Sequence, residues 1–541
     1  DGNTDDRTVA CVPLPRPVAP GEVLTFTLDW AAKLPRAQAR TGWKDDFVMG
    51  AQWFPKLGAA TESGWNVHQF HAGTEFFADF GDYDVTLTLP REMKGKVGAS
   101  GVQKEETDVA DGVRVRFVAE DVHDFAWAAS PRFEVSRETF SEPGLPNVEM
   151  ILLLQPDHRR VRNRYFTATR AALREFGRRY VPYPYPEVTI VDPPWGAPSG
   201  GMEYPTLFTG GAAWLSPAGT GSPEGVTVHE FGHQIFCGLL ASNEFEEAQM
   251  DEGFDTYATD VTMRAAFGDS PLVVRFFGIP VVFRSVLLPR PEWGNERYLD
   301  WQVTSRSDPT SRTTFRMLDG AAIRVNAYSK TALALASAER TLGETTWGAL
   351  MKTYATRFAF RHPTAADFRA VVREIAGEKA DALFREAWDS SNTFDYAVGS
   401  VSTRPIAPLV GWVGEGPERK FHAGARPPKG AAPYESVVVV RRMGEAVWPV
   451  DVELAFEGGH VFRTVWDGVD RWIRYRATGP KLVSARVDPD RKLLLDVNVL
   501  NNGRKVEPDR RAASSWSSRL RFWAQNALEF FTLLGFTGAR R

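Results

Sequence analysis

Two histidines four residues apart, in the segment TVHEFGHQIF (227–236), constrain this chain more than any other feature. Four residues turn an α-helix by about 400°, so the imidazoles of His229 and His233 would lie on one face, one turn apart. Two nitrogen ligands at that separation can hold a single Zn²⁺ ion. Glu230 is offset by about 100° along the helix and suits a carboxylate that activates a water molecule. The alternative is a helix whose histidines are only hydrogen-bonded or exposed.

A third ligand is expected, because catalytic zinc sites usually keep three protein ligands. Glu252 follows His233 after 18 residues, in the segment AQMDEGFDTYATD (248–260). A second helix packed against the first can bring its carboxylate to the metal. The sequence therefore predicts one Zn²⁺ per chain, held by His229, His233 and Glu252. Asp251 and Asp255 are candidates to accept the second N–H of each histidine, and the alternative for all these acids is an exposed helix start.

Two further segments have physical interpretations of their own. In SGGMEYPT (199–206), Gly200 and Gly201 would let a substrate backbone approach closely, and the strand that follows could pair with an extended peptide. Pro205 fits an edge strand, where Glu203 would line a cleft or be an exposed charge. In YSKTALALASAERTLG (328–343), Tyr328 is either a core tyrosine or a hydrogen-bond donor to the substrate.

Together these motifs, in this order and spacing, resemble the gluzincin zinc aminopeptidases related to aminopeptidase N and leukotriene hydrolase. SGGMEYPT is similar to that family's Gly-x-Met-Glu-Asn exopeptidase motif, and YSK to its Tyr-x-Lys helix. The resemblance implies a thermolysin-like catalytic domain and a peptide substrate with a free N-terminus. Glu203 would bind the α-amine, and Gly200, Gly201 and Met202 would line the substrate site.

The resemblance also implies that Tyr328 stabilises the oxyanion, and such donors are typically worth about 2.7–4 kcal/mol. Three departures put the pocket for the first side chain in doubt: Tyr204, Ile235 and Gln249 replace an Asn and two Trp residues common in the family. The expected activity is removal of N-terminal residues by metal-activated water. The alternatives are a zinc endopeptidase, another zinc hydrolase such as an epoxide hydrolase, or a non-catalytic peptide-binding protein.

The distribution of apolar residues predicts a multidomain α+β chain of 541 residues. Residues 1–147 read as an N-terminal β domain, 148–395 as the catalytic domain, 396–505 as a β-sandwich and 506–541 as an amphipathic helical tail. Period-two alternation predicts strands at 21–30, 82–90, 112–120, 434–444, 449–459 and 492–503, and apolar runs predict strands at 148–156 and 187–194. Helices are predicted at 162–180, 224–241, 252–267, 326–342, 364–388 and 512–536. Residues 286–320 read as a long surface connection and 425–433 as a linker.

The tail helix places large apolar residues three or four positions apart, with Arg519 and Arg521 beside them. Packing against the protein's own body is favoured over a membrane-surface helix. Its apolar positions are Trp516, Leu520, Trp523, Ala527, Phe531 and Leu534.

Composition narrows the partners. Lys plus Arg is 64 and Asp plus Glu is 68, for a net charge of −4, which gives no reason to expect nucleic acid as a partner. No apolar run reaches the roughly 18–20 residues that a membrane span needs. The two cysteines, Cys11 and Cys237, cannot form a disulfide framework, and Cys237 reads as a small buried residue rather than a thiol beside the metal. The chain begins at Asp1, so a targeting segment would lie outside it; an extracytoplasmic or membrane-associated location is favoured over a cytoplasmic one, and the oligomeric state is open.

Overall fold

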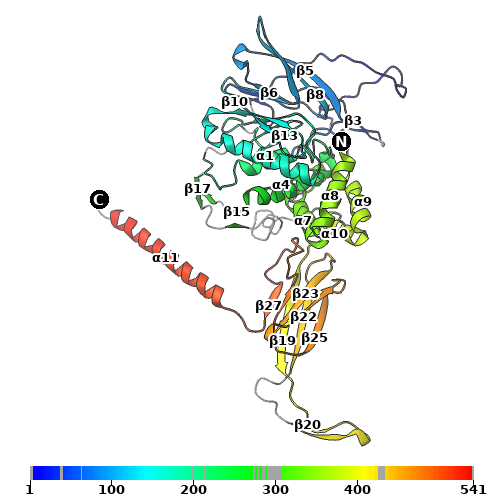
Figure 1. The fold of residues 1–541 in the computed structure, drawn as a ribbon, viewed down its shortest axis with the longest axis vertical. Coiled ribbons are helices and arrows are strands. Elements are labelled where there is room, and N and C mark those ends of the chain that lie inside the picture. The colour runs from blue at the N-terminus through cyan, green and yellow to red at the C-terminus, as the bar shows by residue number, and fades with distance from the viewer. Residues whose placement is uncertain are drawn as a thin grey trace. The chain divides into compact units, whose positions relative to one another are not determined.

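The chain is a mixed α+β protein with two compact units, as expected for a multidomain α+β chain (Figure 1). Unit 1 comprises Asp1–Asn392 and Lys492–Leu495, and unit 2 comprises Thr393–Arg491 and Asp496–Arg541. The chain therefore leaves unit 1, builds most of unit 2 and returns briefly to unit 1. The computed structural model describes residues 4–36, 40–61, 64–197, 199–212, 215–271, 274–276, 279–282, 287–288, 301, 307–424 and 433–538.

The N-terminal part of unit 1 is built from antiparallel strands. One sheet has the order β1-β2-β9-β6 and another β5-β8-β7, beside the hairpin β3–β4. The predicted strands at 82–90 and 112–120 are confirmed as β5 and β8, whose alternation buries Val113, Val115 and Phe117. The bounds of the nine strands described in this part of unit 1 are β1 Gly42–Lys44, β2 Phe47–Gly50, β3 Ala59–Thr61, β4 Gly64–Asn66, β5 Gly81–Leu89, β6 Val97–Ala99, β7 Val102–Val109, β8 Gly112–Val122 and β9 Trp127–Ala129.

The predicted strand at 21–30 is wrong. These residues form no strand, and all their side chains are exposed. Their apolar and polar residues alternate as in a half-buried strand. A strand also needs a neighbouring strand for its backbone N–H and C=O groups, and none pairs with this segment in the described structure.

A five-stranded mixed sheet lies beneath the candidate site, in the order β10-β11-β12-β14-β13. The three inner strands are parallel and the two outer ones run antiparallel to their neighbours. The predicted strands at 148–156 and 187–194 are confirmed as β11 and β12. β11 is apolar except for Glu149, which suits a strand buried on both faces. The bounds are β10 Glu134–Phe140, β11 Val148–Leu154, β12 Glu187–Val191, β13 Met202–Tyr204 and β14 Leu207–Thr209.

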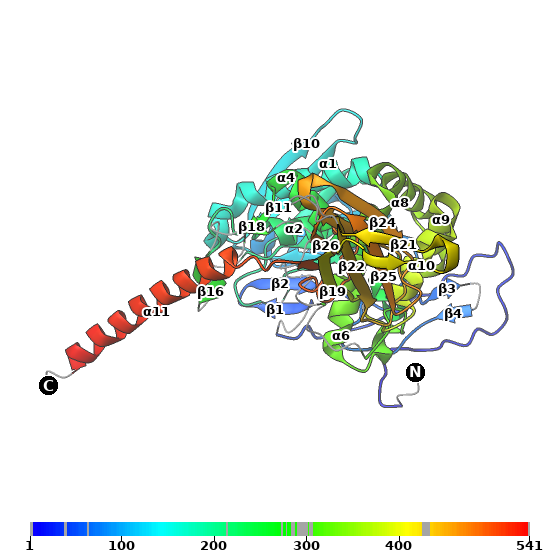
Figure 2. The ribbon, with the colours of Figure 1, turned by 90° about the horizontal axis from the view of Figure 1, so that it is seen from below.

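Helices α1, α2 and α4 pack on one another beside strand β11 (Figures 1 and 2). The predicted helices at 162–180 and 252–267 are confirmed as α1 and α4, whereas α8 was not predicted. The longer helices are α1 Arg162–Arg179, α2 Glu224–Gly232, α4 Glu252–Phe267, α7 Thr331–Leu342, α8 Glu344–Phe358, α9 Ala365–Ala376 and α10 Glu378–Trp388. The short ones are α3 Glu244–Glu247, α6 Gly320–Arg324 and the π-helical segment η5 Val325–Lys330, with 3₁₀ turns at Arg91–Met93, Pro156–Val161, Ala248–Met250 and Thr314–Arg316.

Three predicted helices have different bounds in the structure. The helix predicted at 224–241 ends at Gly232, because the following backbone hydrogen bonds shorten to three residues at Gln234 and Ile235 and lengthen to five at Gly238. The helix predicted at 364–388 is two helices, because Gly377 takes a φ of 83°. The helix predicted at 326–342 is α7 preceded by a π-helical turn.

Unit 2 contains two antiparallel sheets, β19-β22-β25 and β24-β23-β26-β27, with β19 lying against β26 and β27. The strands predicted at 434–444 and 449–459 are confirmed as β22 and β23. Strands β20 and β21 form a separate hairpin, and two short 3₁₀ turns lie at Gly416–Glu418 and Glu457–Gly459. The strand bounds are β19 Tyr396–Pro405, β20 Val410–Val413, β21 Lys420–Ala423, β22 Tyr434–Arg442, β23 Val450–Phe456, β24 Val461–Trp466, β25 Trp472–Gly479, β26 Leu482–Val487 and β27 Gly503–Lys505.

The strand predicted at 492–503 is wrong. Leu493, Leu494 and Leu495 are buried in unit 1. The backbone N–H of Leu494 donates to Ser337 Oγ at 2.9 Å, and the C=O of Leu495 accepts from Trp301 Nε1 at 2.9 Å. Side chains of helical residues therefore take the bonds that a neighbouring strand would have made.

The tail forms helix α11 (Arg511–Gly538), close to the helix predicted at 512–536. Its large apolar side chains are exposed, at 62% for Trp516, 73% for Trp523 and 67% for Phe531, so the favoured packing against the protein's own body is not found among the described side chains. No helix in the described part of the chain has the length and hydropathy that crossing a membrane requires.

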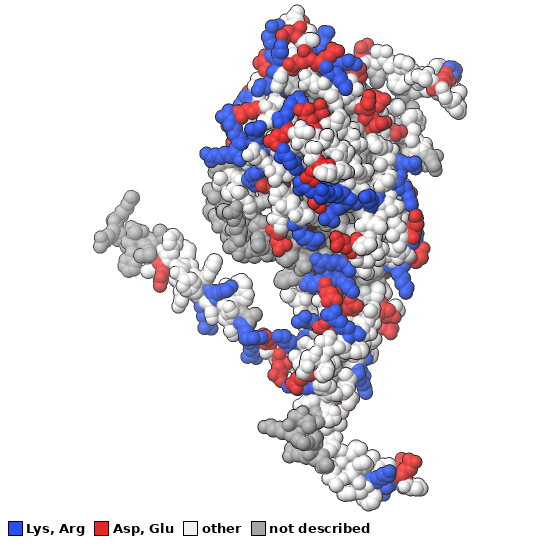
Figure 3. Space-filling model, in the orientation of Figure 1, with Lys and Arg blue, Asp and Glu red and all other residues white. Residues whose placement is uncertain are grey.

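Two predicted connections lie largely outside the described residues. Of the segment 286–320, the structure describes 287–288, 301 and 307–320, and of the linker 425–433 only residue 433. On the face drawn in Figure 3, Lys and Arg side chains are interspersed with Asp and Glu, and neither sign of charge dominates that face.

Candidate metal centre

The three predicted metal ligands converge. His229 lies near the end of α2, His233 caps it, and Glu252 is the first residue of α4. The two Nε2 atoms are 3.3 Å apart, and Glu252 Oε2 lies 3.4 Å from each of them. His233 and Glu252 are buried and His229 is half-buried. The chain therefore brings two imidazole nitrogens and one carboxylate oxygen to the corners of a nearly equilateral triangle.

This triangle fits a zinc ion. Zinc binds nitrogen and carboxylate oxygen at about 2.0–2.2 Å, which places neighbouring ligands of a tetrahedral site about 3.3–3.5 Å apart. The buried Glu252 Oε2 also has no hydrogen-bond partner in the described structure, although it faces both histidines. Buried carboxylate oxygens are normally bonded, so an atom left in this state suits a metal ligand. The group could hold one metal ion.

Each histidine is held by a carboxylate of α4 or the turn before it. His229 Nδ1 lies 2.5 Å from Asp255 Oδ2, and His233 Nδ1 lies 2.6 Å from Asp251 Oδ1. These bonds place the N–H on Nδ1 and leave Nε2 of each ring to face Glu252. Burial lowers the pKa of His229, but the charge and hydrogen bond of Asp255 outweigh it and raise that pKa to about 10.

Glycine at position 232 allows this arrangement. A Cβ there would overlap Asp255 Oδ1 and would lie 2.7 Å from the Phe176 ring. The absent side chain lets α4 approach α2 closely enough for Asp255 to reach His229. The motif therefore depends on packing between the two helices as well as on the spacing of its histidines.

Glu230 lies beside the metal group without belonging to it. Its carboxylate is buried, and Oε2 has no hydrogen-bond partner in the described structure. Burial raises the pKa of Glu230 well above its usual range, while His229 opposes this shift. A Cβ on Gly201 would lie 3.5 Å from Glu230 Oε1, so the glycine turn before β13 faces this carboxylate. The Glu230 carboxylate thus lies beside a turn at Gly201 that has no side chain.

Tyr328 also reaches the metal group. Its hydroxyl donates a short hydrogen bond to Glu252 Oε1, and its ring stacks on His229 with centroids 6.2 Å apart. It is carried by η5, whose π-helical turn inserts an extra residue before α7. Such turns are frequent at functional sites because they redirect one side chain out of the helical register.

Glu203 lies on β13, at the edge of the five-stranded sheet, with Gly200, Gly201 and Met202 immediately before it. Its carboxylate is grouped with those of Glu75 and Glu244, and one oxygen of each lies within 4.8 Å of the others. Arg40 donates a short hydrogen bond to Glu75. Burial raises the pKa of Glu203 to about 7 and that of Glu75 to about 8. Nearby carboxylates act in the same direction, Glu252 and Asp251 on Glu203 and Glu203 on Glu75.

Sequence reasoning missed Glu75 and Glu244. Glu75 lies in a loop of the N-terminal strand region and Glu244 begins the short helix α3, so neither belongs to a motif around Glu203. Three acids within four residues, at 244, 246 and 247, were the only local signal. The structure distinguishes these acids: Glu244 is buried, whereas Glu246 is hydrogen-bonded to His68 at 2.9 Å.

The three departures from the family pattern are all buried. The backbone C=O of Tyr204 accepts from Gln234 Nε2 at 3.0 Å, which ties β13 to the turn after α2. Ile235 and Gln249 are 0% and 1% exposed. These residues therefore act on the site through the packing beneath it.

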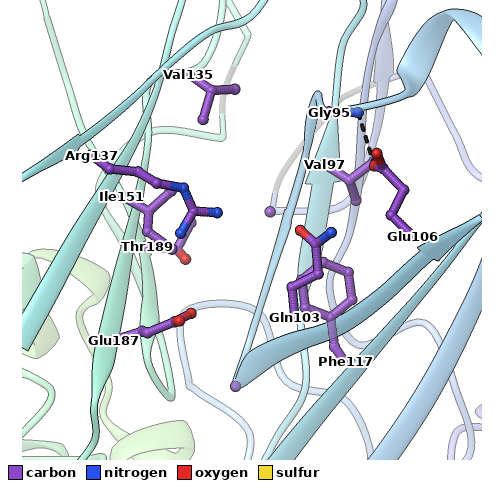
Figure 4. Close-up of a pocket in the computed structure, with 12 residues that line it drawn as sticks. Gly95, Val97, Gln103, Glu106, Phe117, Val135, Arg137, Ile151, Glu187 and Thr189 are labelled. Carbon is purple, nitrogen blue, oxygen red and sulfur yellow. Dashed lines mark hydrogen bonds between the residues drawn. The ribbon is translucent and has the colours of Figure 1, made fainter.

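Two other features lie apart from the metal group. A cavity of about 260 Å³ lies between β6–β8 and β10–β12, with Arg137 and Glu187 on one wall and Glu106 on the other (Figure 4). None of the predicted site residues lines it. Cys237 is half-buried and not one of the grouped ligands; its Sγ lies 4.0 Å from His123 Nε2, and burial raises the pKa of its thiol well above the usual range.

Comparisons with known proteins bear on the fold. No family model matches the sequence, and no curated protein matches it. Among solved structures, Legionella pneumophila aminopeptidase A in complex with aspartic acid aligns with 74% of this chain and 42% of its own, at 11% identity and a TM-score of 0.51. An M1 zinc metallopeptidase from Deinococcus radiodurans aligns with 57% of this chain and 64% of its own, at 18% identity and a TM-score of 0.42.

The chain thus spans less than two thirds of the length of both proteins. The likeness to the Legionella structure concerns the fold, and at that level it confirms the expected resemblance to aminopeptidase N-like zinc peptidases.

Proposed function

We propose that this chain is a zinc-dependent aminopeptidase that removes N-terminal residues from peptides. The observation that carries the proposal is the triangle of His229 Nε2, His233 Nε2 and Glu252 Oε2, with edges of 3.3–3.4 Å. Beside it lies the Glu230 carboxylate, whose Oε2 has no hydrogen-bond partner among the described residues. The size of the triangle suits one Zn²⁺ per chain. We also propose that residues 148–395 form a thermolysin-like, gluzincin-type catalytic domain.

Bound to this triangle, zinc would supply Lewis acidity to a substrate carbonyl and lower the pKa of a water molecule. Glu230 would accept the proton of the attacking water and return it to the leaving amine. Its burial and raised pKa suit a group that must both take and release a proton. Tyr328 would exchange its hydrogen bond to Glu252 for one to the oxyanion.

The exopeptidase assignment is supported by the acidic group beside β13. An extended peptide can add to this edge strand, where Gly201 leaves room for its backbone beside Glu230 and Met202 would contact the first residue. Gly200 instead allows a close approach within the chain, because a Cβ there would lie 2.7 Å from Gly210 O. Glu203 would then hold the α-ammonium of that residue. An endopeptidase would place an internal part of its substrate at this position, with no ammonium to pair with Glu203. Leaving that buried carboxylate without a cation is costly.

Two alternatives make different demands on the same site. Another zinc hydrolase would use the metal group and Glu230 without needing an ammonium at Glu203. A non-catalytic peptide-binding protein would be expected to have lost a ligand or the base, yet the three ligands converge and Glu230 is present in the same motif. The geometry therefore favours a hydrolase.

The decisive test is a panel of aminoacyl-fluorophore substrates. We expect turnover that a chelator abolishes and zinc restores, and no turnover of the matching N-acetylated substrates. Glu230→Gln should keep one zinc per chain and lose about 10²- to 10⁴-fold in kcat. Equal cleavage of free and acetylated substrates would overturn the exopeptidase assignment, and an active Glu230→Gln variant would overturn the base.

The remaining expectations on organisation and partners stay proposals. We propose an N-terminal β domain (1–147), a C-terminal β-sandwich (396–505) and a helical tail (506–541), with a peptide as substrate. We also propose that α11 lies on a lipid surface, because its exposed indoles are flanked by Arg519 and Arg521. Such an association fits an extracytoplasmic or membrane-associated location.

A further inference from the structure

The acidic group beside the metal centre contains more carboxylates than a single substrate ammonium can pair with. It comprises Glu75, Glu203 and Glu244, and one oxygen of each lies within 4.8 Å of the others. Charges in such an arrangement are stable only when cations or hydrogen-bond donors lie among them. The partners of each carboxylate show where a cation is lacking.

Of the three carboxylates, Glu75 has a cationic partner in the structure, and the proposed function supplies one for Glu203. Glu75 accepts a hydrogen bond from the Arg40 guanidinium, which is itself half-buried. Glu203, on the edge strand, is the carboxylate to which the proposed function assigns the α-ammonium. This leaves Glu244, which is 4% exposed. Its carboxyl bonds Asp251, but its Oε1 has no hydrogen-bond partner in the described part of the chain.

Local structure holds Glu244 in the group. It is the first residue of α3, which the side chain of Asn243 caps by accepting from the N–H of Phe245 at 3.1 Å. The other acids of α3 are used elsewhere: Glu246 bonds His68, and Glu247 Oε2 accepts the N–H of Ala365 at 3.0 Å. Glu244 is thus the one acid of this helix directed toward Glu203.

We propose that Glu244 is a specificity determinant that binds the side-chain cation of the substrate's first residue, so that the enzyme prefers N-terminal Lys and Arg. This proposal rests on the proposed aminopeptidase function. The α-ammonium would occupy Glu203, and the ammonium or guanidinium on the flexible stem of the same residue would reach Glu244. Hydrogen bonds to charged groups are the strongest that a buried carboxylate can accept.

A divalent metal is the other cation that three carboxylates could bind. The Arg40 guanidinium argues against it, because it already bonds Glu75 within the group and would repel a second metal ion. The Glu244 carboxyl also bonds Asp251, the residue that holds His233, so a third state has Glu244 permanently protonated to donate this bond. In that state Glu244 would support the metal centre and would not discriminate between substrates.

The test compares lysyl and norleucyl fluorophore substrates, which differ by the side-chain ammonium at similar length. With the zinc-loaded full chain, we expect kcat/KM to be about 10- to 100-fold higher for lysyl than for norleucyl, as one charge-assisted hydrogen bond implies. Glu244→Gln should remove this ratio by lowering the lysyl value alone. Glu246→Gln, on the same helix but bonded to His68, should preserve it.

Binding gives a second measurement that does not need turnover. L-lysine should raise the Tm of the zinc-loaded protein more than L-norleucine does, and Glu244→Gln should abolish the difference. A lysyl-to-norleucyl ratio near one, or an equal loss with both substrates in Glu244→Gln, would overturn the proposal while leaving the aminopeptidase intact. Two metal ions per chain, one of them lost in Glu244→Gln, would overturn it in favour of a metal site. No cleavage of any aminoacyl substrate would instead refute the proposed function.

Discussion

At the scale of single residues, the metal centre depends on side chains that never touch the metal. Asp255 and Asp251 accept from the Nδ1 atoms of His229 and His233 and so fix which nitrogen each ring presents to Glu252. Both carboxylates are fully buried. An imidazole that lacks such a partner can rotate or change tautomer, and both changes weaken a metal site.

Asp255→Asn should therefore lower zinc affinity by about 10- to 100-fold, since the amide keeps the shape but not the charge that orients His229. Competition with a fluorescent zinc chelator measures this affinity directly. Glu224→Gln is the matched control, because Glu224 begins α2, the helix that carries His229, but pairs with Arg164. Equal affinities for Asp255→Asn and the parent chain would show that the aspartate does not support the site.

The residues of the metal group could be predicted from the sequence because helical geometry ties them together. The spacing of His229 and His233 defines one helix face, and Glu252 follows at the start of the next long helix. Glu75 and Glu244 could not be predicted in the same way. Their approach to Glu203 depends on how a loop of the strand region and a four-residue helix pack against β13, and no local periodicity encodes that packing.

At the scale of elements, the crossing of α4 with η5 positions both Glu252 and Tyr328. Gly253 lies at this crossing, where a Cβ would overlap the Thr331 side chain and lie 2.5 Å from Ala327 O. Gly253→Ala should push the two helices apart and separate Tyr328 from Glu252. We expect kcat to fall by at least tenfold, because displacements of about 1 Å can cost about 10²-fold.

Gly225→Ala is the control for this substitution. Gly225 lies in α2, where a Cβ would meet nothing within 4 Å, so alanine should raise helix stability without affecting kcat. Steady-state kinetics and thermal unfolding of both variants separate the two effects. Similar kcat values for Gly253→Ala and Gly225→Ala would show that the close crossing is not needed for turnover.

The element predictions failed where tertiary contacts overrode a local pattern. The alternation at 21–30 lacks a partner strand, and the alternating residues at 492–503 bury three leucines against helices instead of joining a sheet. The helix predicted to continue to residue 241 ends at Gly232, after which the chain turns towards Arg361, whose C=O accepts from the N–H of Ala241 at 2.9 Å. Long, strongly periodic segments such as 162–180 and 252–267 were predicted well because packing and propensity agree there.

Helix α11 makes a prediction of its own. Trp516 and Trp523 lie on one face, and the guanidinium of Arg519 lies 5.6 Å from the centre of the Trp516 ring. We expect the full chain to sediment with vesicles containing phosphatidylglycerol and less with pure phosphatidylcholine, as indoles and arginines at an interface imply. Replacing both tryptophans with alanine should abolish sedimentation. Gln525→Ala, about 180° around the helix from Trp516, is the control, and equal sedimentation of all variants would contradict the lipid-surface proposal.

At the scale of the whole molecule, the path of the chain links the folding of unit 1 to residues far along the sequence. Lys492–Leu495 returns to unit 1 after the chain has built the sheets of unit 2. Leu493, Leu494 and Leu495 are 3%, 1% and 0% exposed, and their backbone is bonded to Ser337 and Trp301. Ser337 belongs to α7, the helix that continues from the turn carrying Tyr328. The candidate site is thus supported by a segment that no reading of residues 1–392 alone would include.

A chain cut after residue 392 should therefore be much less stable than one cut after residue 510, which loses only α11 and the residues beyond it. Three fully buried leucines contribute roughly 5–9 kcal/mol, comparable to the whole stability of a typical domain. We expect residues 1–510 to keep the Tm and zinc content of the full chain, and residues 1–392 to melt many degrees lower or fail to fold. Differential scanning calorimetry with metal analysis measures both. If residues 1–392 melted with the full chain and kept one zinc, the returning segment would be dispensable, and the core of unit 1 would be complete before the chain enters unit 2.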